Sequence, residues 1–156
     1  MSSNDQDHPG VIALPPFIFL GFLLAGLALE YLMPSEVPAA LARYLVGGGL
    51  AIAGLGLAFA ARGRFVAAGT NVRPTLPATA LVTQGPYRFT RNPMYLALTA
   101  IYFGIAIAVG SWWLIVLTLP LLLVMEFGVI RREERYLAAK FGTAYTDYMA
   151  TVRRWL

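Results

Sequence analysis

The sequence predicts an all-α integral membrane protein with four transmembrane helices, a cytoplasmic loop and an amphipathic C-terminal helical tail. Of its 156 residues, 58% are hydrophobic and only 13% are charged, which lies outside the range of ordinary soluble domains. Four apolar runs have the length of about 20 residues that a helix needs to cross the hydrocarbon core. The chain is of single-domain size, so we expect residues 1–156 to form one membrane-embedded domain.

Each predicted span follows the previous one closely, apart from one longer connection. The first begins with Pro15 and Pro16, which cost little in a first helical turn because the N–H groups there have no helical partner. No Lys or Arg precedes it, so we expect a retained helix rather than a cleaved secretory signal. Gly110 and Ser111 allow only a tight turn, which makes the last two spans an antiparallel hairpin. The predicted spans are residues 14–33, 41–61, 93–109 and 112–130.

The basic residues predict the orientation of the chain. All Lys and Arg residues except Arg43 fall in the long connection, residues 62–93, or after Ile130. The positive-inside rule places both segments and both termini in the cytoplasm, at the inner or plasma membrane if the source is bacterial. The membrane topology thereby explains the net charge of +4. The basic residues then need no nucleic-acid partner, and we expect no binding to nucleic acid. The remaining segments are a flexible tail, residues 1–12, and a cytoplasmic or interfacial tail, residues 131–156.

Two residue types that often carry chemistry are nearly missing. The chain has no cysteine, which excludes disulfides, thiolate metal sites and a cysteine nucleophile. Its one histidine, His8, lies in the polar N-terminal tail. We therefore expect neither a metal site nor a Ser-His catalytic arrangement.

Small residues recur in the second span. Gly47, Gly49 and Gly54 are each followed four residues later by an alanine. This spacing lets helices approach closely in lipid. We expect close packing within the membrane or a homodimer, and no chemistry, at these positions.

The stretch GPYRFTRNPMYL, residues 85–96, leads into the third span. Asn92 and Pro93 are the residue types of a helix N-cap and a first helical turn. Arg88 and Arg91 lie just before that helix start, whose free N–H groups carry a partial positive charge. Together these features predict a site for a carboxylate or phosphate at the membrane surface. In the alternative interpretation, Asn92 only caps the helix and the arginines extend to lipid headgroups.

Acidic residues follow in and after the fourth span. Glu126 lies inside the apolar run, and ionisable groups there are functional candidates because their burial is costly. Glu133 lies seven residues later, on nearly the same helix face, and Glu134 adjoins it. A structural alternative stays open for each residue. In this alternative Glu126 is protonated or bonded to a neighbouring helix, and Glu134 pairs with Arg131 three residues earlier.

The predicted hairpin brings the Asn92 and Glu133 ends to the same membrane surface. An anion-binding helix start facing a carboxylate suits a zwitterionic ligand such as an amino acid. The tail continues with aromatic and apolar residues at three- and four-residue steps. We expect two short amphipathic helices, separated at Gly142, that lie in the headgroup layer and either cover the site or serve only as an anchor.

The stretch GPYRFTRNPMYL, followed one hairpin later by EERYLAAKFGTAYTDYMATVRR, resembles the isoprenylcysteine carboxyl methyltransferase family and the related phospholipid N-methyltransferases. The likeness extends over roughly residues 69–156. The form Asn-Pro-Met-Tyr at residues 92–95 and the run TAIYFG are more similar to phosphatidylethanolamine methyltransferases. The resemblance implies S-adenosylmethionine as cofactor, bound between the last two spans and the tail. The residues implicated in cofactor binding are Gly85, Tyr87, Arg88, Arg91, Asn92, Tyr95, Glu133 and Glu134.

The activity that this resemblance implies is methyl transfer to a lipophilic or amphiphilic acceptor at the cytoplasmic membrane face. Such a site mainly aligns donor and acceptor and excludes water. If the acceptor is an amine, a base must take its proton, and Glu126 and Glu133 are the candidate catalytic residues. A carboxylate acceptor needs no base. Two other interpretations stay open: a membrane reductase with a nicotinamide cofactor, and a non-enzymatic membrane interaction protein.

Overall fold

The computed structural model describes residues 8–156, and all regular structure in this part of the chain is helical. The all-α class predicted from the sequence is therefore confirmed. The longer helices form a bundle, and the shorter elements connect or follow them. In chain order the elements are α1 (Pro15–Leu32), α2 (Leu41–Ala67), the 3-10 turn η1 (Gly85–Arg88), α3 (Pro93–Val109), α4 (Trp112–Met125), the π-helical turn η2 (Glu126–Ile130), α5 (Arg131–Phe141) and α6 (Thr143–Thr151).

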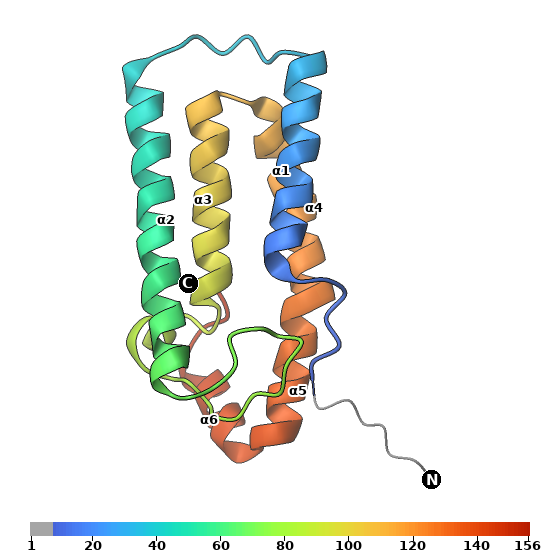
Figure 1. Ribbon diagram of the computed structural model, residues 1–156, viewed down its shortest axis with the longest axis vertical. Helices are drawn as coiled ribbons and strands as arrows, with labels where there is room; N and C mark the ends of the chain where they lie inside the picture. The colour runs from blue at the N-terminus through green and yellow to red at the C-terminus, as the bar shows by residue number, and fades with distance from the viewer. Residues whose placement is uncertain (1–7) are drawn as a thin grey trace.

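The bundle helices stand side by side, with the smaller elements gathered at one end (Figure 1). α2 packs along α3, and α1 packs along α4. The predicted hairpin between α3 and α4 is confirmed, since Gly110 adopts a φ of 75° and Ser111 Oγ accepts a hydrogen bond from Leu114 N at 3.3 Å. α4, η2 and α5 form one continuous rod, so α5 extends beyond the bundle towards α6 and the loop after α2.

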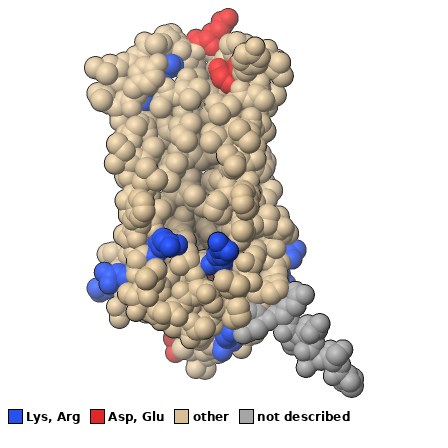
Figure 2. Space-filling view, in the orientation of Figure 1, with Lys and Arg blue, Asp and Glu red and all other residues tan. Residues whose placement is uncertain are grey.

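Three helical rods among the described residues are long and apolar enough to cross a membrane: Pro15–Leu32, Leu41–Ala67 and Trp112–Phe141. The third rod carries Glu126 at the start of η2, and its run of charged residues begins at Arg131, after α4 and η2. α3 is also apolar but has only 17 residues. Figure 2 shows an uncharged belt across the middle of the visible face, with charged side chains at the two ends.

α2 is longer than predicted. The loop expected over residues 62–93 begins only after Ala67. Arg62 and Arg64 end the apolar stretch, but a charged side chain does not break a helix. The first residue with a helix-breaking conformation is Gly69, at a φ of 66°, and α2 ends just before it.

Glycines bring the backbones of α2 and α3 into contact. A Cβ atom on Gly47 would collide with the Gly104 carbonyl, and one on Gly54 would lie 2.8 Å from the Ala97 carbonyl oxygen. Gly49, in contrast, faces open space. The small residues of the second span therefore serve close packing within one chain.

Segments from both ends of the described chain pack at the α5 end of the bundle. Of the predicted flexible tail, residues 1–7 lie outside the described residues. Ile12 N donates to Gly128 O at 3.2 Å, and Arg132 Nη1 donates to Gly10 O at 2.9 Å. At the other end the predicted break is confirmed, because Gly142 adopts a φ of 55° and separates α5 from α6.

Candidate functional site

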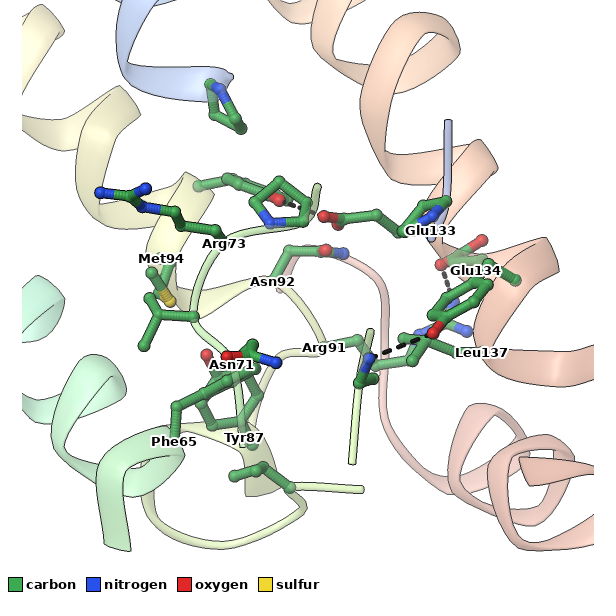
Figure 3. Close-up of a pocket in the computed structure, with 18 of the residues that line it drawn as sticks. Phe65, Asn71, Arg73, Tyr87, Arg91, Asn92, Met94, Glu133, Glu134 and Leu137 are labelled. Atoms are coloured by element: carbon green, nitrogen blue, oxygen red, sulfur yellow. Dashed lines mark hydrogen bonds and ion pairs between the residues drawn. The ribbon is translucent and has the colours of Figure 1, made fainter. Parts of the chain in front are cut away.

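A cavity of about 410 Å³ lies at the end of the bundle where α5, α6 and the loop after α2 gather. This volume is within the range of about 300–1,000 Å³ typical of small-molecule sites. Part of the wall is polar, with Arg91 and Asn92 on one side and Glu133 and Glu134 projecting from α5 on the other (Figure 3). The rest is largely apolar and reaches the first turn of α1 and the facing part of α2. One cavity thus offers both polar and apolar surfaces.

Arg91 is the buried cation of the polar wall. Its side chain is 10% exposed, and Nη2 lies 3.3 Å from Glu134 Oε1. Its backbone N–H donates to Arg153 O at 2.9 Å, which fixes the residue in place. Nε and Nη1 are buried and have no hydrogen-bond partner among the residues that the structure describes. Because a buried donor without a partner is costly, these two groups make Arg91 a candidate for binding an anionic ligand group.

Glu133 approaches the cavity from α5. Tyr95 Oη on α3 donates to Glu133 Oε1 at 2.6 Å. Burial raises the pKa of the Glu133 carboxyl to about 7; the Tyr95 hydrogen bond opposes this rise, and the negative charge of Glu134 adds to it. A carboxyl with such a pKa exchanges its proton near neutral pH, which suits it to accept a proton or to face a cation.

Asn92 occupies the N-cap position of α3, but its side chain does not cap the helix. Its Nδ2 donates instead to Arg154 O at 2.9 Å. The N–H groups of Tyr95 and Leu96 both bond to Asn92 O, so the backbone closes the first turn of α3. The predicted side-chain cap is therefore wrong, because a carbonyl distant in the sequence takes up the amide.

Glu134 and Glu126 belong to one ion-pair network centred on Arg154. Arg154 donates to Glu134 through Nε at 3.0 Å and Nη2 at 2.6 Å, and to Glu126 through Nη1 at 2.6 Å. Arg131 Nε donates to Glu126 at 2.9 Å, so Arg131 pairs with Glu126 and not, as in the structural alternative, with Glu134. Glu126 does not line the cavity, and the structure places it apart from Glu133, the other predicted catalytic residue.

The predicted site residues fall into two groups. Arg88 is exposed and outside the cavity wall. Gly85 is also outside it and shapes the turn η1, since its φ is 63° and a Cβ atom there would lie 2.6 Å from Arg64 Nε. Those that line the cavity are Tyr87, Arg91, Asn92, Tyr95, Glu133 and Glu134.

Several residues of the wall were not singled out from the sequence. α6 contributes Tyr145 and Tyr148, and Tyr148 Oη donates to Tyr87 O at 2.7 Å. The aromatic spacing of the tail indicated a cover over the site but not which rings face inwards. Phe17 on α1 and Ala58 on α2 belong to the apolar wall. No local pattern marks these two, because their proximity depends on how separate helices pack.

Comparison with known proteins identifies the family. The model of the family described as phospholipid methyltransferase matches residues 42–144, about two thirds of the chain. The chain belongs to this family. The resemblance seen in the sequence is thereby confirmed. An uncharacterized protein of Haemophilus influenzae is 42% identical over 65 residues, which are 40% of this chain and 100% of that protein. No solved structure matches the chain significantly.

Membership of the phospholipid methyltransferase family gives the cavity a chemical context. The matched segment includes every predicted site residue, from Gly85 to Glu134. The family and the apolar helices together support methyltransferase activity and a membrane location. Arg154, the centre of the ion-pair network, lies beyond the matched segment.

Proposed function

We propose that this protein is an integral membrane methyltransferase that uses S-adenosylmethionine to methylate a lipophilic or amphiphilic acceptor at the cytoplasmic membrane face. The observation that carries this proposal is the polar wall of the cavity. There a buried arginine with unpartnered N–H groups shares a small chamber with a carboxyl whose pKa is about 7. A ligand that carries an anion and a cation close together satisfies both.

The residues present fit S-adenosylmethionine. The carboxylate of its amino-acid group suits Arg91 Nε and Nη1, because charge-assisted bonds to a guanidinium are strong and directional. Its cationic groups suit the carboxylates of Glu133 and Glu134. The rings of Phe65 and Tyr87, 5.3 Å apart, give an aromatic surface for the adenine.

The protein residues have three tasks in this proposal. When bound, the cofactor supplies a methyl group made electrophilic by a sulfonium. Arg91 and Asn92 orient the ligand, and the tyrosines of α6 help to exclude water from the cavity. If the acceptor is an amine, Glu133 takes the proton that the nitrogen loses, since its pKa lies near the working pH. Glu126 is not proposed for this role, because it lies outside the cavity wall.

The apolar wall supports a lateral route for the acceptor. Phe17, at the start of α1, lines the cavity and is 64% exposed, which places one of its faces towards the surrounding lipid. Ala58 on α2 lines the same part of the wall. We propose that an acceptor with hydrocarbon chains enters between these two helices while its polar head reaches Glu133.

The charge distribution supports four spans with both termini in the cytoplasm. At the end of the bundle away from the cavity, the charged residues are Glu30, Glu36 and Arg43. The remaining basic residues belong to α2's last turns, the following loop and the segment after Ile130. In this topology α3 is a short fourth span packed against α2.

Calorimetric titration of the detergent-purified protein tests the proposal. We expect S-adenosylmethionine and S-adenosylhomocysteine to bind, and Glu133→Gln and Arg91→Lys each to weaken binding by about tenfold or more. Arg62→Ala, which removes an exposed arginine outside the cavity wall, is the matched control and is expected to bind normally. A folded wild-type protein that binds neither compound overturns the proposal, and reduced nicotinamide cofactors are then the next ligands to titrate.

A further inference from the structure

We infer that Arg154 is a positioning residue of the site: its side chain holds Glu134, and so leaves Nε and Nη1 of Arg91 for the carboxylate of the ligand's amino-acid group. This inference rests on the proposed function. It concerns a residue beyond the segment matched by the family model, which ends at residue 144.

The guanidinium of Arg154 joins two carboxylates from different elements. It makes a two-pronged contact with Glu134 on α5, and its third nitrogen bonds to Glu126 at the start of η2. The side chains of Glu134 and Glu126 are 11% and 16% exposed, so both charges need a partner. A two-pronged contact fixes the plane of the carboxylate as well as its position.

The backbone of the same segment holds the residues before α3. Arg154 O accepts from Thr90 Oγ1 at 3.1 Å and from Asn92 Nδ2 at 2.9 Å. Arg153 O accepts from Arg91 N at 2.9 Å. Residues 90–92 are therefore bonded at three successive positions to two residues of the C-terminal segment. Through its side chain and its carbonyl, Arg154 connects η2 and α5 to the start of α3.

Arg154 also competes with Arg91 for Glu134. Arg91 approaches Glu134 with one nitrogen at 3.3 Å, a longer distance than either Arg154 contact. Without Arg154, Arg91 is left as the cation paired with a nearly buried Glu134, and electrostatic attraction draws its free N–H groups towards that carboxylate. The carboxylate of an incoming ligand then meets an arginine whose Nε and Nη1 groups are also engaged by Glu134.

If the C-terminal segment only closed the cavity, a change in it would affect the affinity for all ligands of the cavity alike. A side chain that acts through Glu134 and Arg91 affects only ligands that carry the amino-acid group. S-adenosylhomocysteine carries this group, whereas 5′-methylthioadenosine keeps the adenosine and the thioether but lacks it. The difference between these two ligands therefore separates positioning from simple closure.

The experiment compares the affinity of the full-length wild-type protein and of Arg154→Ala for the two compounds by calorimetry in detergent. We expect Arg154→Ala to weaken S-adenosylhomocysteine binding by about tenfold or more, and methylthioadenosine binding by less than about twofold. Arg135→Ala, which removes an exposed arginine of α5 outside the cavity wall, is the matched control and is expected to leave both affinities unchanged.

Equal losses for the two ligands, or no loss for either, would overturn the inference. If Arg154→Ala does not fold, Arg154→Lys takes its place; it keeps a cation but cannot make the two-pronged contact, so the same selective loss is expected at smaller size. Failure of the proposed function is visible separately, because the wild-type protein itself then binds neither S-adenosylmethionine nor S-adenosylhomocysteine.

Discussion

Tyr95 Oη donates a hydrogen bond to Glu133 Oε1 at 2.6 Å and thereby ties the first turn of α3 to the first turn of α5. This contact opposes the rise in the pKa of Glu133 that burial causes. The carboxylate that we propose to face the cofactor is therefore held in place, and kept partly ionised at neutral pH, by a side chain of α3.

Tyr95→Phe removes this hydrogen bond and keeps the ring. The pKa of Glu133 should rise further, because the bond to Tyr95 is what lowers it. At pH 7 we expect affinity for S-adenosylmethionine to fall about tenfold, since a hydrogen bond to a charged group contributes about 1.5–3 kcal/mol. Titrations of both proteins from pH 6 to pH 9 measure the effect. Identical affinities across that range would rule out a role for the contact in binding.

The affinity of the wild-type protein for its cofactor should depend on pH. Burial raises the pKa of Glu133 to about 7, so the unliganded carboxyl is mostly protonated below that pH and ionised above it. A cationic ligand favours the ionised form, and affinity should therefore rise through pH 7 and level off above it. Below pH 7 binding should release a proton, which calorimetry detects in two buffers of different ionisation enthalpy. In Glu133→Gln this proton release should be lost.

A larger side chain in the apolar wall should separate cofactor binding from turnover. Ala58→Phe places a ring in the proposed entry route between α1 and α2, in the apolar part of the cavity wall. We expect cofactor affinity to stay within about twofold of the wild-type value, while methyl transfer to a lipid acceptor falls by about tenfold or more. Ala60→Phe, on an exposed position of α2 outside the cavity wall, is the control. Loss of cofactor binding in Ala58→Phe would contradict a route that serves the acceptor alone.

Close packing of α2 on α3 should be sensitive to one methyl group. In Gly104→Ala the added Cβ atom would lie 2.6 Å from Gly47 O and 2.7 Å from Ala51 N, so the helices must move apart. We expect the free energy of unfolding to fall by about 1–3 kcal/mol, as in other overpacked interiors. Gly56→Ala, where the new atom meets nothing within 4 Å, should be neutral or slightly stabilising. Thermal unfolding in detergent compares the two variants.

The sequence predicted the helices best where the signal is local. The bounds of α3 were correct, because Pro93 begins the helix and Gly110 ends it through conformations that these residue types favour. The helix break predicted at Gly142 was also correct, because glycine favours the backbone conformation that ends α5. The end of α2 was missed because the change from apolar to charged residues near Arg62 marks the end of the apolar stretch rather than the end of the helix.

The candidate site was predictable in its composition but not in its connections. Arg91 and Glu133 were singled out from the sequence because charged residues beside an apolar span are candidates for a functional role. The roles of Asn92 and Glu134 were not predictable, because both depend on Arg154, which reaches them only after the C-terminal segment folds back. The π-helical turn at Glu126 has no local sequence signature either, and it accompanies contacts with Arg131 and Arg154.

The length of α2 has a consequence for how the proposed reaction depends on its substrate. Ala61 packs against Tyr87 beside the cavity, and α2 continues from there to Ala67, about 9 Å farther along the bundle. In the proposed topology the site then lies at the depth of the lipid headgroups, so that the polar head of a lipid acceptor reaches it while the acyl chains stay in their leaflet. Turnover then follows the mole fraction of acceptor in the bilayer and not its bulk concentration. Dilution of the acceptor with inert lipid slows the enzyme even when the total amount of acceptor is unchanged.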